Sequence, residues 1–179
     1  MTSKANSKLG FLKRNLRGVP SSLRLTAYIS IVRSALEYGS ASWDPYHKGS
    51  IKQIELVQNR AMRWIKGLPP IDRTHIATLQ ERTGLDPLED RRRDARLGYM
   101  FRVMHGHVGI GRDQLNLVPA DSRRAGHALK LKHKGGKNDP LKHSFVRRTI
   151  PQWNNLPAAT AEAGDLDSFK AQLAAARHP

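Results

Sequence analysis

The sequence of residues 21–39 is SSLRLTAYISIVRSALEYG. Its apolar residues recur every three to four positions, the spacing that aligns side chains along an α-helix. They form two adjacent rows, which are Leu23, Ala27, Ile31 and Ala35, and Leu25, Ile29, Val32 and Leu36. A helix that is apolar around so much of its circumference is usually buried among other helices. The segment therefore predicts a helical bundle in which this helix packs among the others.

Other segments carry helical periodicity and end signals, whereas strand signals are scarce. These segments are residues 50–66, 72–82, 87–105 and 165–176. Ser50 and Gln53 have the spacing of a capping box, and Asp86 is expected to cap the helix that begins at Pro87. We therefore predict an all-α fold, a small bundle of about four to five helices with a basic, partly extended C-terminal arm and a short final helix.

Three regions are predicted along the chain. Residues 1–118 form the helical domain, residues 119–143 a basic flexible arm, and residues 144–179 a segment whose short helix packs back on the bundle. The arm is assigned because it is polar and basic and contains the pair Gly135-Gly136, which favours a flexible loop. Segment 87–105 is expected to bury Leu97, Met100, Phe101 and Met104, and the short final helix is expected to bury Leu166, Phe169 and Leu173.

The chain is strongly basic. Its 179 residues include 31 Lys and Arg against 15 Asp and Glu, which gives a formal net charge of +16. Residues 1–40 contain seven basic residues and one acidic residue, and residues 119–150 contain nine and two. This charge favours nucleic acid or another polyanion as the partner, because each neutralised phosphate releases condensed counterions. An anionic membrane surface, the rival partner, would need a basic helix with bulky apolar residues on its other face.

Residue types that support catalysis or metal binding are sparse. The chain has no cysteine, which excludes disulfides, thiolate nucleophiles and zinc sites that need sulfur. It has no GxxxxGK[ST], GxSxG or HExxH motif and no two adjacent Asp residues. His127, His133 and His143 lie in a positively charged segment, where a solvated role is expected because the segment would repel a metal ion. The chain is predicted not to be an enzyme and to use no cofactor or metal.

Nothing in the sequence indicates a membrane or secreted protein. No segment approaches the roughly 18 consecutive apolar residues of a membrane-spanning helix. The N-terminal stretch MTSKANSKLGFLKRNL lacks the apolar core of a secretory signal. We therefore expect an intracellular protein, in either the nucleus or the cytoplasm.

Tryptophan and arginine positions have a structural and a functional interpretation. Trp64 and Trp153 are expected to anchor the core, and Trp43 either does the same or stacks on a base. Arg91-Arg92-Arg93 is expected to be a solvated helical face. In the alternative it contacts a ligand with at most two of its members, because three successive residues point in three directions around a helix.

Several short motifs occur in an order that is typical of one protein family. They are KLGFLKRNL (8–16), LEYG (36–39), WDPY (43–46), LVQNRA (56–61), DPLEDRR (86–92), SF (144–145), RTI (148–150), WN (153–154) and LP (156–157). On these motifs, the chain resembles, over about residues 7–173, the segment that follows the palm in jockey-like and CR1-like non-LTR retrotransposon reverse transcriptases.

The resemblance implies a thumb, whose helices hold the primer–template duplex, and a post-thumb region. It also implies a fragment, because the endonuclease and the palm with its Tyr-x-Asp-Asp box lie upstream in the family and are absent from this chain. Such a fragment would neither polymerise nor cut DNA by itself. The cysteine-rich zinc knuckle of some other lineages is absent too. The implied partners are RNA or an RNA–DNA hybrid, and a separate reverse-transcriptase palm.

The leading prediction is a non-catalytic module that binds RNA or an RNA–DNA duplex through its phosphates. The candidate residues are Lys13, Arg14, Arg17, Arg60, Arg63, Arg123, Arg124, Lys130, Lys132, Lys134 and Arg148. Lys130, Lys132 and Lys134 alternate, so an extended backbone would present all three along one edge. Two alternatives are a protein-interaction module with an uncovered apolar face and a non-functional relic of the retrotransposon.

Overall fold

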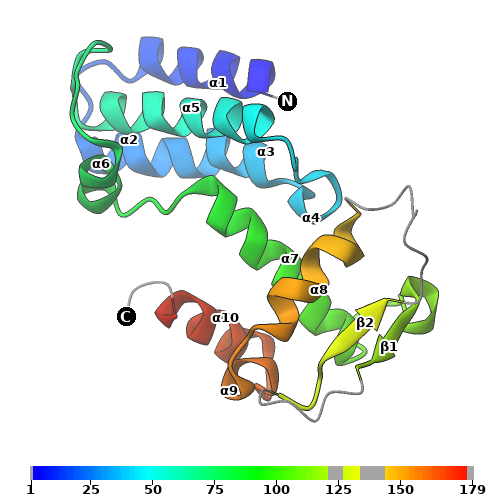
Figure 1. The fold of residues 1–179 in the computed structure, drawn as a ribbon. Coiled ribbons are helices and arrows are strands. Elements are labelled where there is room, and N and C mark those ends of the chain that lie inside the picture. The colour runs from blue at the N-terminus through cyan, green and yellow to red at the C-terminus, as the bar shows by residue number, and fades with distance from the viewer. Residues whose placement is uncertain (1, 121–126, 134–143, 177–179) are drawn as a thin grey trace. The chain divides into compact units, whose positions relative to one another are not determined.

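The computed structural model describes residues 2–120, 127–133 and 144–176. These residues are predominantly helical and include one small two-stranded sheet, which confirms the predicted all-α class (Figure 1). The chain divides into two compact units, Met1–Arg92 and Arg93–Pro179. This division differs from the predicted regions, because residues 93–118 group with the C-terminal half. The cause is a shared core in which Phe101 packs against Phe169 with ring centroids 4.6 Å apart.

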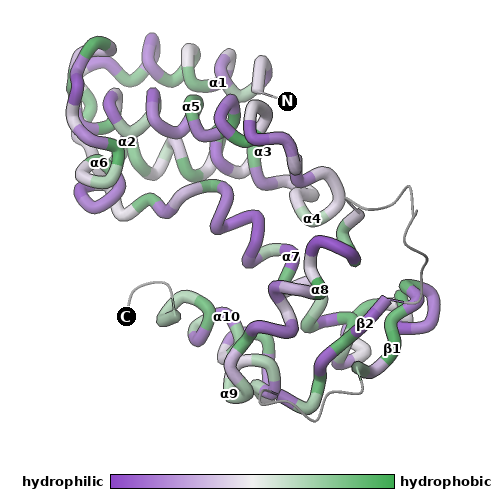
Figure 2. Tube along the Cα trace, in the orientation of Figure 1, coloured by the Kyte–Doolittle hydropathy of each residue, from purple (hydrophilic) through white to green (hydrophobic). Residues whose placement is uncertain are grey.

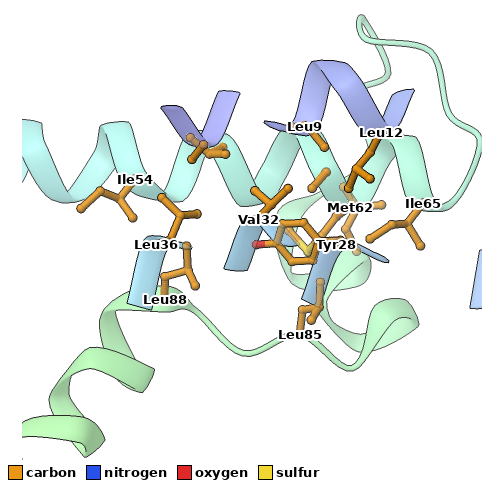
Figure 3. Packing of buried hydrophobic residues seen from close by; sticks show 14 residues of the cluster. Leu9, Leu12, Tyr28, Val32, Leu36, Ile54, Met62, Ile65, Leu85 and Leu88 are labelled. Atoms are coloured by element: carbon orange, nitrogen blue, oxygen red, sulfur yellow. The ribbon is translucent and has the colours of Figure 1, made fainter. Parts of the chain in front are cut away.

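Helices make up the regular structure of the first unit. They are α1 (Thr2–Asn15), α2 (Ser21–Ala27), the π-helix η1 (Tyr28–Arg33), α3 (Ser34–Glu37), α4 (Ser40–Trp43), α5 (Lys48–Ile65) and α6 (Ile76–Thr83). Helix α1 packs against both η1 and α5, and α6 packs against α5. Figure 3 shows the resulting core, in which Leu9 and Leu12 of α1 lie near Met62 and Ile65 of α5. Helix α1 was not among the helices predicted from the sequence.

Helices α2, η1 and α3 form one continuous helical stretch over the predicted segment 21–38. The predicted burial on most sides is wrong, because Leu23 is 58% exposed and Ile31 38% exposed. The core is reached instead by Tyr28, Val32 and Leu36, which are completely buried. These three residues are spaced four apart. A π-helix has more residues per turn than an α-helix, so residues four apart within it lie on nearly the same side of the helix.

The buried face of this helical stretch includes a hydrogen-bonded polar pair. The Tyr28 hydroxyl donates to Oε1 of Gln58 at 3.0 Å, and Gln58 Nε2 donates to the Asp86 carbonyl at 2.8 Å. Burial raises the pKa of Tyr28 above its usual value. The pair thereby satisfies polar groups that would otherwise be costly to bury.

Two of the predicted helix starts are displaced. Helix α5 begins at Lys48 after an extended His47, so Ser50 lies inside the helix and the predicted capping box is wrong. Helix α6 begins at Ile76 rather than at Asp72, because Asp72 Oδ1 accepts the Thr74 amide at 2.8 Å in a local turn. Its predicted end is confirmed by Gly84, which is left-handed with φ of 65°.

Helix α7 (Leu88–Met104) contributes residues to both units. Its first turn is capped from another helix, because Glu55 Oε1 accepts the Glu89 amide at 2.8 Å. The predicted burial of its apolar residues is confirmed for Leu97, Met100, Phe101 and Met104.

The second unit combines short helices with the small sheet. After the second part of α7 come η2 (Asp113–Leu115), β1 (Leu117–Pro119), β2 (Leu131–His133), α8 (Phe145–Asn154), α9 (Ala158–Ala161) and α10 (Leu166–Ala175). The strands are antiparallel, with Leu117 opposite His133. Trp153 of α8 is completely buried, which confirms its predicted place in the core. Phe169 and Leu173 of α10 are buried as predicted, whereas Leu166 is only partly buried.

Residues 127–133 of the predicted flexible arm are packed against α8. The Trp153 indole N–H donates to the Leu129 carbonyl at 2.8 Å. The Asn154 side chain both donates to the Leu131 carbonyl (2.8 Å) and accepts its amide (2.9 Å). This stretch is therefore part of the second unit, while residues 121–126 and 134–143 of the arm lie outside the described residues.

The Asp165 cap of α10 predicts a pH-dependent contribution to stability. Its carboxylate accepts the amides of Asp167 and Ser168, both at 2.9 Å, and these hydrogen bonds lower the pKa of Asp165. A lowered pKa in the folded state stabilises the fold above the unfolded pKa, near 4, and this stabilisation is lost as the pH falls through the folded value.

Replacing Asp165 by alanine is expected to lower the Tm at pH 7 by about 2–4 °C. The difference from the wild type should disappear between pH 5 and pH 2, measured by thermal unfolding at each pH. Asp165→Asn is the matched control, because an asparagine cap keeps an acceptor oxygen and does not titrate. A difference that stays constant down to pH 2 would contradict the role assigned to the Asp165 carboxylate.

Candidate nucleic-acid interface

A pocket of about 360 Å³ lies in the first unit. It is lined by Lys13, Arg60, Arg63, Trp64, Leu68 and Pro70. Three of these, Lys13, Arg60 and Arg63, are candidate residues predicted from the sequence. The structure therefore brings together cations from two segments that are more than forty residues apart in the sequence.

Packing between α1 and α5 builds this pocket. Leu12 of α1 and Ala61 of α5 are buried in the same core, so Lys13, which follows Leu12, lies beside α5. On α5 the spacing of Arg60, Arg63 and Trp64 places them on one side of the last two turns. The amphipathic pattern of both helices is visible in Figure 2, where hydrophilic and hydrophobic residues alternate along α1 and α5.

The loop after α5 completes the pocket. Gly67 is left-handed with φ of 70°, and its amide donates to the Trp64 carbonyl at 3.1 Å. The Leu68 amide donates to the Arg63 carbonyl at 2.9 Å. These bonds end the helix in the manner of a C-terminal cap and fix Leu68 next to the last turn.

The hydrogen bonds of the pocket arginines go to neutral oxygen atoms. The Asp72 carboxylate lies near Arg63, since its pKa is lowered by hydrogen bonds from Thr74 and, to a smaller extent, by the charge of Arg63. Arg60 Nη1 donates to Oδ1 of Asn6 at 3.3 Å. Arg63 donates to the carbonyls of Asp72 (3.1 Å) and Asn59 (3.3 Å). Within the described part of the chain, neither these arginines nor Lys13 forms an ion pair with a carboxylate. Burial, and next the charge of Arg60, lower the pKa of Lys13.

The arginines at the start of α7 behave differently, because each has an acidic partner. Arg92 Nε donates to Asp44 Oδ1 at 2.7 Å, Arg91 binds Glu37, and Arg93 Nη2 lies 3.3 Å from Asp94 Oδ1. The solvated face predicted for this run is wrong for Arg92, whose side chain is only 1% exposed. The first half of α7 is mostly hydrophilic in Figure 2, yet its central arginine is a core residue.

The other candidate residues do not line the pocket. Arg14 and Arg17 are exposed at and just after the end of α1. Lys132 is exposed on β2 and Lys130, beside it, is half-buried. Arg148 is half-buried on α8, near Arg96. Burial, and next the charge of Arg148, lower the pKa of the buried Arg96 to about 10. Arg123, Arg124 and Lys134 lie outside the described residues.

Two features of the pocket were missed by the sequence analysis. Trp64, predicted as a core anchor, is half-buried and lines the pocket. Arg24 lies with its guanidinium 5.8 Å from the centre of the Trp64 ring and donates to the Trp64 carbonyl at 3.0 Å. Because Arg24 belongs to a helix forty residues earlier in the chain, no local sequence signal could have paired it with Trp64.

The predicted solvated role of His127 is wrong. Its ring is buried, and Nε2 donates to the Trp153 carbonyl at 2.9 Å. No group of three or more His, Asp or Glu residues suited to a metal ion is found among the residues that the structure describes. No described helix is long and apolar enough to cross a membrane.

Comparisons with protein-family models, with curated proteins and with solved structures each gave no match to this chain.

Proposed function

We propose that the chain is a non-catalytic nucleic-acid-binding module that contacts the phosphates of RNA or an RNA–DNA duplex. The observation that carries the proposal is the gathering of Lys13, Arg60 and Arg63 around one pocket, where none of the three forms an ion pair within the described part of the chain. Positive charge of this kind attracts polyanions, and counterion release makes the attraction favourable. The net charge of +16 supports the same partner class.

We further propose that the module derives from the thumb of a reverse transcriptase. The ordered motifs that resemble the segment after the palm of non-LTR retrotransposon reverse transcriptases support a thumb-like fragment. In that role the helices of the first unit hold a duplex, and catalysis belongs to a separate palm. The contacts then position the nucleic acid through its backbone and carry little sequence information.

A fluorescence-anisotropy titration tests the proposal. Labelled RNA–DNA hybrid, duplex DNA and single-stranded RNA are each titrated with the full chain at several salt concentrations. Binding should weaken linearly in a plot of log K against log salt, with a slope that counts the neutralised phosphates. Absence of binding to all three at low salt would overturn the proposal.

Replacing Arg60 by glutamine is expected to weaken binding to all sequences alike. Arg60 is exposed and, among the residues that the structure describes, its side chain hydrogen-bonds to Asn6 alone, so the fold should tolerate the change. Loss of one phosphate contact should reduce the steepness of the salt plot by roughly 1. The matched control is Lys170→Gln, which removes an exposed cation that is paired with Asp167. An Arg60→Gln variant with an unchanged slope, or with an altered sequence preference, would contradict the assignment.

A protein-interaction module is the second candidate, and exposed apolar side chains favour it. Leu23, Tyr38 and Ile71 of the first unit all lie largely in solvent. Single exposed apolar residues are common on protein surfaces, so they carry less weight than the cations clustered around the pocket. Failure of the titration with all three nucleic acids would favour this candidate.

A further inference from the structure

The pocket contains apolar side chains that phosphate binding alone does not require. Lys13, Arg60 and Arg63 supply positive charge, but Trp64, Leu68 and Pro70 add an apolar part to the lining. A duplex presents its phosphates outward with the bases stacked inside, and a phosphate gains nothing from contact with apolar groups. An apolar wall beside three cations instead suits a ligand that has a flat apolar part next to an anionic part.

The size of the pocket limits what can enter it. A volume of about 360 Å³ is near the lower end of the roughly 300–1,000 Å³ found for small-ligand pockets. It suits one ring-bearing group and not an intact helix. A single unstacked base with its own phosphate has a suitable size. It also combines a flat apolar ring with an anionic group, which match the apolar and the cationic parts of the lining.

The lining is held in place before any ligand binds. Arg24 lies over the Trp64 ring and binds the Trp64 carbonyl, which fixes the last turn of α5. Arg63 is fixed by the carbonyls of Asn59 and Asp72, and these bonds leave other N–H donors of its guanidinium free for a ligand. A site held in this way binds with a smaller loss of conformational entropy.

The lining also indicates how selective the site is. The lining has no amide or carboxylate side chain to read the edge of adenine or cytosine, and its Lys and Arg side chains, which can contact guanine, are assigned to the phosphates. Aromatic stacking accepts every base, because each base has a π-face. Little preference among the four bases is therefore expected.

We propose that this pocket holds one unpaired base of a bound strand, packed against Trp64, while Lys13, Arg60 and Arg63 bind the adjacent phosphates. The inference rests on the proposed function, because it assumes that the first unit binds a nucleic-acid strand. It adds that the pocket recognises the strand where it is single-stranded.

Two labelled single strands of equal length test the inference, a thymidine oligomer and an abasic oligomer that keeps the phosphates and lacks the bases. The full chain should bind the thymidine oligomer about tenfold more tightly, a difference of about 1.4 kcal/mol. Both strands should show the same salt slope, because their phosphates are the same. Free thymidine monophosphate, added at the concentration of the oligomer, should not compete.

Variants of Trp64 locate the base. Trp64→Leu should reduce the preference for the thymidine oligomer to less than about twofold, and Trp64→Phe should keep most of it, because phenylalanine also stacks. Trp43→Leu is the matched control, since Trp43 is also half-buried in the first unit but does not line the pocket. Circular dichroism verifies that each variant is folded.

The outcomes separate the two proposals. Equal binding of the two strands by the wild type overturns this inference and leaves phosphate binding intact. A tenfold preference that survives in Trp64→Leu also overturns it, as does competition by the free mononucleotide. Absence of binding to either strand at low salt also overturns this inference, whereas the proposed function is overturned only if the RNA–DNA hybrid, the duplex DNA and the single-stranded RNA all fail to bind as well.

Discussion

Replacing Asp44 by alanine is expected to lower the free energy of unfolding of the first unit by about 3–5 kcal/mol. Asp44 accepts the Arg92 Nε–H at 2.7 Å, and the two side chains are 5% and 1% exposed. The variant would leave the Arg92 guanidinium buried beside Glu55, whose Oε1 lies 3.9 Å from Arg92 Nη2. Glu55 alone would then face this charge, and a buried charge that has lost its hydrogen-bonded partner is much less favourable than a fully paired charge or an apolar side chain.

Urea unfolding followed by circular dichroism measures this loss. The double variant Asp44→Leu with Arg92→Met removes both charges, so it should be more stable than Asp44→Ala alone. The matched control is Lys170→Ala, which breaks an exposed pair with Asp167 and should change stability by less than about 1 kcal/mol. A loss of less than about 1 kcal/mol in Asp44→Ala would show that the buried pair is not needed for the fold.

Replacing Trp153 by alanine is expected to destabilise the second unit by about 3–5 kcal/mol. The indole is completely buried, lies with its ring centroid 6.1 Å from that of Phe169, and donates its N–H to the Leu129 carbonyl. The substitution removes a large apolar volume and also the hydrogen bond that joins α8 to residues 127–133. Both losses act on the same core.

Thermal unfolding followed by circular dichroism should show a Tm for Trp153→Ala that is lower by more than about 10 °C. Trp153→Phe retains most of the apolar volume and loses the hydrogen bond, so its Tm should lie between those of the wild type and Trp153→Ala. Trp43→Ala serves as the comparison, because Trp43 is only half-buried. A Trp153→Ala protein with a Tm within about 2 °C of the wild type would contradict the central place of this indole.

Local signals were sufficient to predict most of the long helices. The segments 50–66, 87–105 and 165–176 correspond to α5, α7 and α10 because each has an apolar stripe and a definite end. Helix α1 was missed because its buried stripe is narrow, consisting of Ala5, Leu9 and Leu12 among polar residues. Packing against η1 and α5, rather than intrinsic pattern, stabilises such a helix.

Pairings between distant segments were not predictable from the sequence. Arg92 and Asp44 are 48 residues apart, and only the fold shows that they are buried together. The candidate site was predicted in part for the same reason. Arg60 and Arg63 could be expected to lie together because both belong to α5. Lys13 and Arg24 belong to other helices, so their position beside α5 could not be predicted.

The π-helix η1 has a consequence for how this sequence tolerates changes in length. A π-turn closes its hydrogen bonds over one residue more than an α-turn, so it is equivalent to a one-residue insertion into an α-helix. Deleting a single residue from Tyr28–Arg33 would therefore allow an ordinary α-helix across the segment and leave α2 and α3 in nearly the same rotation about the helix axis. The hydrogen bond between Tyr28 and Gln58 and the burial of Leu36 could then both be retained. At this point of the chain, the helix accommodates the loss of one residue without turning its two ends away from the core.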